Sequence, residues 1–97
     1  MNSKTAGQVP QPDHAARQAI LKLLTDKMPM QQEGLDSCLK RATTLTEGLS
    51  AAELSNICQE AALQVLRSDI DAVSIPHSVL EHQCEVFQLR TQVVSRQ

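Results

Sequence analysis

The side chains best suited to catalysis or metal binding are three cysteines and two histidines that lie near the third cysteine. Cys38, Cys58 and Cys84 are odd in number, have no C-x-x-C spacing, and each falls in an apolar or helical stretch. This usage favours buried, reduced thiols over a disulfide or a metal site. His77, His82 and Cys84 lie close in sequence, but no paired ligands occur elsewhere, so we expect no zinc site and no other metal.

Groups for catalysis are equally sparse. The phosphate-binding pattern G-x-x-x-x-G-K-[ST] is absent, and no paired carboxylates stand in an apolar setting. The three histidines lie in polar or turn contexts, and His14 is interpreted as a solvated residue in the first turn of a helix. We therefore predict that the chain is not an enzyme and needs no cofactor in isolation.

Size and composition set further limits. A chain of 97 residues is one domain at most, and such a domain buries roughly 60–65% of its unfolded surface. A net charge of −2 without a Lys/Arg cluster argues against a nucleic-acid partner. No apolar run approaches the roughly 20 residues of a membrane span, and the N-terminus lacks the apolar segment of a secretory signal. We expect a cytoplasmic or nuclear location.

The chain is organised around a central helix, residues 51–66. Ser50 is a candidate N-cap, and Glu53 stands three residues later, which together make a capping box. The stretch has no Gly or Pro, and its apolar residues follow helical spacing. The predicted core face comprises Ala51, Leu54, Ile57, Cys58, Ala61, Ala62, Val65 and Leu66.

Two shorter helices are predicted before it. The first runs from about Asp13 to Met28, where Pro29 ends it. Its predicted apolar face is Ala16, Ala19, Ile20, Leu23, Leu24 and Met28, widened by Leu21. The second runs from about Cys38 to Thr44 after a cap at Asp36 or Ser37, with Leu35, Leu39 and Ala42 facing inward.

A last helix is predicted from Val79 to Val94, with Ser78 as a possible cap and Pro76 just before it. Its main face is Leu80, Cys84, Phe87, Thr91 and Val94. Val73 and Ile75 could form a brief extended stretch upstream. The prediction is an all-α, four-helix bundle over residues 12–94, between a flexible tail at 1–11 and a short tail at 95–97.

Two separated motifs resemble one known family. Thr46-Glu47-Gly48, Ser50-Ala51-Ala52-Glu53-Leu54 and Cys58-Gln59-Glu60-Ala61-Ala62 are similar to T-x-G-x-S-G-A-D-L…C-x-E-A-A. That pattern belongs to the small helical lid subdomain of AAA+ ATPases of the valosin-containing-protein class. Upstream, Val9-Pro10-Gln11-Pro12-Asp13, Arg17 and Ile20-Leu21 resemble the motif that opens the same lid. Asp69-Ile70-Asp71-Ala72 looks most like the spermatogenesis-associated-protein-5 group.

The resemblance implies a lid without its catalytic core, because Lys4 to Gln8 do not match the family's preceding segment. In a full-length relative, the lid would close over ATP and Mg²⁺ bound by the large subdomain and contact the neighbouring subunit of a hexameric ring. The positions that would approach the nucleotide are Ala51, Ala52 and Leu24, where the family has a Gly at the first and some relatives have a His at the last. On its own the chain would act only as a binding module.

Two alternatives come from other classes. The chain could be an independent helical adaptor that holds a partner helix in a groove. A helix-turn-helix nucleic-acid binder is a third option, which the acidic balance disfavours.

An apolar docking surface is also predicted. Leu63 falls among polar residues of the central helix, and Val79, Val86 and Val93 form a second line on the last helix. A small bundle has limited room to bury both lines, and apolar positions left exposed can mark an interface. We expect these residues to bind a protein partner, such as an AAA+ large subdomain in cis or in a neighbouring subunit.

Overall fold

The computed structural model describes the backbone of residues 11–95 and the side chains of residues 11–91. Four helices occupy this range: α1 (His14–Asp26), α2 (Leu35–Leu45), α3 (Ala51–Ser68) and α4 (His77–Ser95). The all-α, four-helix prediction is therefore confirmed. The predicted tails fall almost wholly outside the described residues, as does the side chain of Val93.

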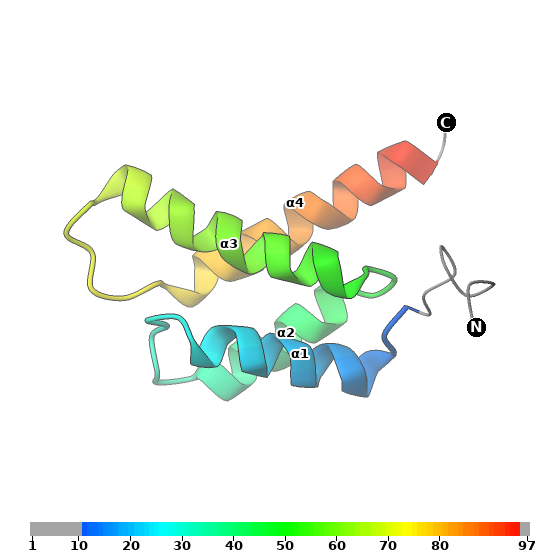
Figure 1. Cartoon of the computed structure of the whole chain (residues 1–97), viewed down its shortest axis with the longest axis horizontal. Helices are drawn as coiled ribbons and strands as arrows, with labels where there is room; N and C mark the ends of the chain where they lie inside the picture. Colours follow the sequence, from blue (N-terminus) through cyan, green and yellow to red (C-terminus); the bar gives the residue numbers. More distant parts are fainter. Residues whose placement is uncertain (1–10, 96–97) are drawn as a thin grey trace, which may run out of the picture.

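Successive helices run in alternating directions, and they pack as a two-by-two bundle (Figure 1). α3 packs against both α1 and α4, and α2 packs against the same two helices. The core consists mainly of small and medium aliphatic side chains, with one aromatic ring at its edge. Its largest fully buried apolar side chains are Leu21, Leu49, Leu54, Ile57 and Leu80.

Two helices begin earlier than the sequence predicts. α2 starts at Leu35 behind Gly34, whose φ of 78° is left-handed, and no side chain caps it. The predicted cap at Asp36 or Ser37 is therefore wrong, because a glycine turn rather than a polar side chain starts the helix. α4 starts at His77 rather than Val79, directly after Pro76, which the sequence analysis placed just before this helix.

The buried face of α1 is rotated from the predicted one. Leu21 is fully buried, whereas Leu23 is 64% exposed and Ala19 is also exposed. The reason is that Arg17 and Thr25 take two of the inward positions. The Thr25 hydroxyl is satisfied there because it donates to the Leu21 carbonyl at 2.8 Å.

At α3, two of the predicted core positions are also wrong. Leu54, Ile57, Cys58 and Ala61 are buried as predicted, but Ala51 is exposed and Leu66 is 51% exposed. These two residues lie at the ends of an 18-residue helix. Of the two helices that pack against α3, α1 is the shorter, with 13 residues.

The two loops at one end of the bundle are joined by backbone hydrogen bonds, which we call the loop clasp. Gln31 N–H donates to the Ile75 carbonyl at 3.1 Å, and Ile75 N–H donates to the Pro29 carbonyl at 2.8 Å. His77 Nε2 lies 2.7 Å from the Gln31 carbonyl. The predicted extended stretch is thus reduced to Ile75, which is buried, while Val73 is 88% exposed.

Within the described part of the chain, no helix combines the length and apolar character needed to cross a membrane.

Candidate functional site

The first turn of α3 has the geometry that the sequence predicts. Ser50 Oγ accepts from Glu53 N–H at 3.2 Å, and the Glu53 carboxylate accepts from Ser50 N–H at 2.8 Å. This reciprocal pair fixes where α3 begins. As a result, Ala51 and Ala52 are presented on the surface, both exposed.

Leu24, the third predicted nucleotide-contact residue, lies elsewhere. It is in the last turn of α1 and packs, partly buried, against the core. α1 and α3 have their N-terminal ends on the same side of the molecule in Figure 1, so Leu24 is displaced along the bundle from the first turn of α3. The structure gives Leu24 a packing role, and nucleotide contact by these three residues stays a prediction.

The predicted docking residues differ in exposure. Leu63 is 36% exposed, in keeping with its place among polar residues of α3. Val79 is partly buried and packs against the core, and Val86 is also partly buried. Their role in binding a partner stays a prediction, to which the structure adds that the valines have some core contact.

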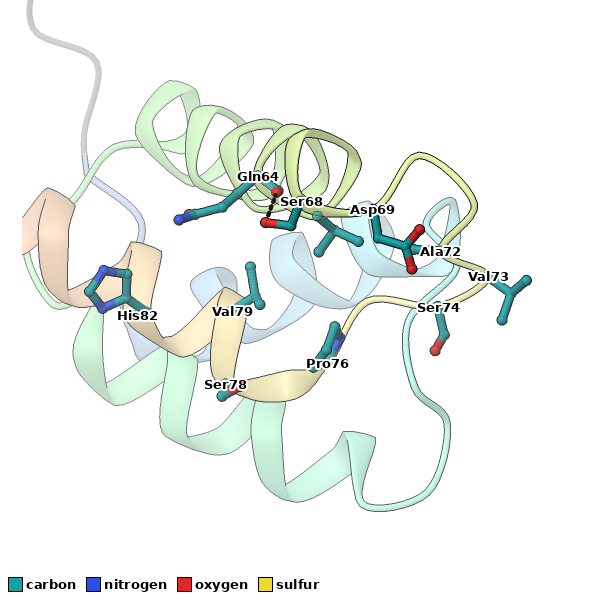
Figure 2. A pocket seen from close by; sticks show the side chains of 11 residues that line it. Gln64, Ser68, Asp69, Ala72, Val73, Ser74, Pro76, Ser78, Val79 and His82 are labelled. Atoms are coloured by element: carbon teal, nitrogen blue, oxygen red, sulfur yellow. Dashed lines mark hydrogen bonds between the residues drawn. The ribbon is translucent and has the colours of Figure 1, made fainter.

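A groove lies where α3 ends, the connection turns and α4 begins (Figure 2). Its volume is about 720 Å³. Val65, Ala72 and Val79 provide apolar lining, and Gln64, Ser68, Asp69 and His82 provide polar groups. Sequence reasoning missed this groove, because it depends on how the connection at 69–76 folds back, and no periodic pattern covers that segment.

Besides the groove, sequence reasoning missed the hydrogen bonds of Arg17. Its side chain is only 5% exposed. Nε and Nη2 donate to the Thr43 carbonyl at 3.3 and 3.0 Å, and Nη1 donates to the Pro12 carbonyl at 3.2 Å. Arg17 thus ties the segment that enters α1 to the last turn of α2. The available signal was its spacing of four from Leu21, on the inward face.

The three cysteines are free and buried, as predicted. Burial raises the pKa of Cys58 to about 11. Burial also raises the pKa of Cys38 to about 11 and that of Cys84 to about 12. The thiols are therefore protonated and poorly nucleophilic near neutral pH. No group of three or more His, Cys, Asp or Glu side chains in the described part is arranged to hold a metal ion.

A comparison with known protein families finds a match to a helical domain. Residues 39–80 match the family model of the AAA+ lid domain. The resemblance to AAA+ lid domains is confirmed. The matched region includes most of α2, all of α3 and the start of α4, so it contains the capping box and all of the groove lining except His82.

Curated relatives give the same result. The proteasome-activating nucleotidase of Methanoculleus marisnigri is 42% identical over 67 residues, which are 69% of this chain and 16% of that protein. The cell division cycle protein 48 homolog of Archaeoglobus fulgidus is 38% identical over 76 residues, 73% of this chain and 10% of that protein. The human ATPase family gene 2 protein homolog B is 40% identical over 68 residues, which are 69% of this chain and 9% of that protein.

The chain therefore spans about a sixth or less of the length of these relatives. The likeness concerns the lid region, and the relatives are of several kinds, including archaeal and human proteins. This range of relatives fits the broader resemblance to AAA+ lids and favours no single subgroup.

Proposed function

We propose that this chain acts as the lid of an AAA+ ATPase, closing over ATP held by a large subdomain and contacting the neighbouring subunit of a ring. The observation that carries the proposal is the capped first turn of α3. It presents Ala51 and Ala52 on the surface at the place where the family motif lies. The match of residues 39–80 to the lid family supports the assignment.

In this proposal the chain's own residues bind and position, and catalysis belongs elsewhere. ATP and Mg²⁺ would be held by the large subdomain, with the α3 first turn lying against the nucleotide. The N–H groups at a helix start carry partial positive charge and favour such polar contacts. The Ala51 methyl group would stand closer to the base than the glycine of the family motif does. The isolated chain is expected to hydrolyse no ATP, because it has no phosphate-binding loop.

A lid exchange tests the proposal. The lid of the Methanoculleus nucleotidase is replaced by residues 11–95 of this chain, and ATP hydrolysis and assembly are measured. We expect the chimera to keep hydrolysis within about tenfold of the parent, whereas a version with the lid deleted loses it. A folded chimera that performs no better than the deletion would contradict the proposal.

A matched pair of variants in the chimera tests the α3 contact itself. Ala52 and Gln59 are both exposed on α3, but only Ala52 is in the first turn. Ala52→Asp places a carboxylate against the bound nucleotide, so it should raise the KM for ATP roughly tenfold, about 1.4 kcal/mol. Gln59→Asp should leave KM unchanged. Equal effects of the two variants would count against contact at the first turn.

The docking residues are examined with the isolated chain and an ATPase core that lacks its lid. Leu63 is exposed and Val86 partly buried, so Leu63→Asp should weaken binding to the core without unfolding the domain. Val86→Asp should weaken binding while costing some stability. Circular dichroism on both variants separates loss of binding from loss of fold. No binding of the unmodified chain to any core would refute docking.

The second candidate, an independent adaptor, draws on the groove. Its apolar lining by Val65, Ala72 and Val79 could take an apolar side chain of a partner. In that case a Val65→Asp variant would lose the partner, while the lid exchange would fail to restore hydrolysis.

A further inference from the structure

Four hydroxyl side chains in the described part of the chain have an acidic residue three positions later. They are Thr44 before Glu47, Ser50 before Glu53, Ser68 before Asp71 and Ser78 before Glu81. Some serine/threonine kinases bind such sequences through a basic substrate groove, by charge complementarity. Ser68 is the one of the four with a second acidic residue directly after it, Asp69.

The fold separates these four sites. A kinase needs a few residues around the hydroxyl in extended form, so the local structure must open. Around Thr44 this would expose Thr43 and Thr46, which are fully buried. Around Ser50 it would expose the buried Leu49 and break the capping box, and around Ser78 it would expose the buried Leu80. Each of these openings disrupts the core.

Ser68 is held far more weakly. Every residue from 66 to 71 is exposed, including Leu66 at 51% and Ile70 at 82%. Opening the last turn of α3 breaks its helical hydrogen bonds, the bond from Asp69 N–H to the Val65 carbonyl at 2.8 Å and the bond from Ser68 Oγ to the Gln64 carbonyl at 3.1 Å, the last of which is drawn in Figure 2. It also loosens two local bonds to Asp69, from Asp71 N–H to the carboxylate and from Ala72 N–H to the carbonyl, each 3.0 Å. None of these groups is part of the buried core. Segments with few buried contacts open at low free energy.

We infer that Ser68 is a phosphorylation site for a serine kinase that recognises acidic sequences. Ser68 Oγ attacks the γ-phosphorus of ATP held by the kinase. A new O–P bond forms, the bond to the β,γ-bridging oxygen breaks and ADP leaves. The hydroxyl proton passes to the carboxylate base of the kinase. Asp69 and Asp71 supply the charge that the kinase reads.

The phosphate would change the end of α3. It adds roughly −1.5 to −2 charges at a helix C-terminus, where the helix dipole is already negative. It stands beside the carboxylates of Asp69 and Asp71, and it removes the Oγ–H that donates to Gln64. These effects all favour unwinding of the last turn. Because Ser68 and Asp69 line the groove, the groove changes shape and gains negative charge.

Phosphorylation of the whole 97-residue protein tests the site. The protein is incubated with ATP and a purified serine kinase of this specificity, and mass spectrometry locates the phosphate. We expect it on Ser68. Ser68→Ala should remove nearly all incorporation and Asp71→Asn should lower it about tenfold, whereas Ser78→Ala should change nothing. Incorporation mainly at Thr44, Ser50 or Ser78, or none at all, would overturn the inference.

Free peptides covering residues 42–50, 48–56, 66–74 and 76–84 show whether the fold contributes. With the fold removed, the preference of the kinase for Ser68 over the other three hydroxyls should shrink severalfold. An unchanged preference would mean that sequence alone selects the site, contrary to the structural argument.

Hydrogen exchange tests the consequence. The Asp69 amide, bonded to the Val65 carbonyl, should exchange roughly fivefold faster or more in the phosphorylated protein. Amides in the middle of α3 should exchange at the same rate as before. An unchanged or slower rate at Asp69 would overturn the proposed unwinding.

Discussion

Arg17 shows how one side chain can stabilise two distant segments. Its buried guanidinium gives two hydrogen bonds to the Thr43 carbonyl and one to Pro12. Thr43 lies near the C-terminal end of α2, where the helix carbonyls carry partial negative charge, and its carbonyl also accepts from Thr46 N–H at 3.4 Å and Thr46 Oγ1 at 3.1 Å. The cation therefore balances the end of α2 while it fixes the direction from which the chain enters α1.

Replacement of Arg17 by Met should destabilise the domain by about 2 kcal/mol, because hydrogen bonds to charged groups contribute about 1.5–3 kcal/mol. Arg17→Lys should recover only part of this loss, since an ammonium group cannot reproduce the planar fork. Urea unfolding followed by circular dichroism measures the change. Arg67→Met is the control: Arg67 is 67% exposed in its contact with Glu60, and its loss should cost under about 0.5 kcal/mol. Equal effects at positions 17 and 67 would contradict the assigned role.

Residue types and spacing explain why this contact escaped sequence reasoning. Arg17 belongs by position to the inward face of α1, one turn before Leu21, but a charged residue is assigned to solvent by default. Cys58 behaved in the opposite way. Its apolar neighbours at helical spacing predicted burial, and it is 4% exposed.

Among the helices, α3 depends most on its own sequence for its start. The capping box satisfies two backbone N–H groups at that end. Ser50→Ala should therefore cost about 1 kcal/mol in the free energy of unfolding. Ser55→Ala, at an exposed position in the same helix, should stay within about 0.5 kcal/mol. Denaturant midpoints report both, and a Ser50→Ala midpoint equal to that of the unmodified protein would show that the cap adds nothing.

The existence of all four helices could be predicted, since each has apolar residues at helical spacing and a Gly or Pro nearby. The starts of α2 and α4 could not. Gly34, with its left-handed φ, precedes α2, and α4 begins at His77 directly after Pro76, whereas the sequence favoured polar caps at Asp36 or Ser37 and at Ser78. The face of α1 was misjudged because Leu21 and Leu23 are equally apolar in sequence, and only packing against α2 and α3 distinguishes them.

For the molecule as a whole, three thiols in one core make stability depend on pH. Burial raises the pKa of Cys38, Cys58 and Cys84 from 9.0 to about 11, 11 and 12. The unfolded chain then releases thiol protons from about pH 9, while the folded chain retains them. Stability should be at its full value below about pH 9 and should fall between pH 9 and 11–12 by up to about 1.4 kcal/mol per pH unit for each thiol.

Denaturant unfolding at intervals from pH 7 to pH 11 measures this slope. Cys58→Ala should make this slope shallower by the contribution of one thiol, up to about 1.4 kcal/mol per pH unit. The substitution also has its own cost in packing, which does not depend on pH. Below pH 9 the thiols of the folded protein should react slowly with a thiol reagent. The thiols of the unfolded protein should react quickly. A flat profile above pH 9, or rapid labelling of Cys58 in the native protein, would contradict the buried-core assignment.

The sequence predicts the candidate site only in part. The motifs around Ser50 indicated the resemblance to AAA+ lid domains and placed Ala51 and Ala52 at a helix start. The apolar spacing of the first helix placed Leu24 on the core face, where the structure has it, whereas the resemblance placed the same residue near the nucleotide. The motifs could not reveal the groove, because its walls come from two helices and a connection whose path depends on the loop clasp.

The loop clasp also affects how fast the domain folds and unfolds. It joins residues up to 46 positions apart, whereas α1 with α2 and α3 with α4 are neighbours along the chain. The contacts between helices that are neighbours along the chain can form early in folding. The loop clasp can form only after the α1–α2 pair has met the α3–α4 pair. The clasp should therefore be absent from the folding transition state. It then acts as a kinetic latch: weakening it speeds unfolding and leaves the folding rate almost unchanged.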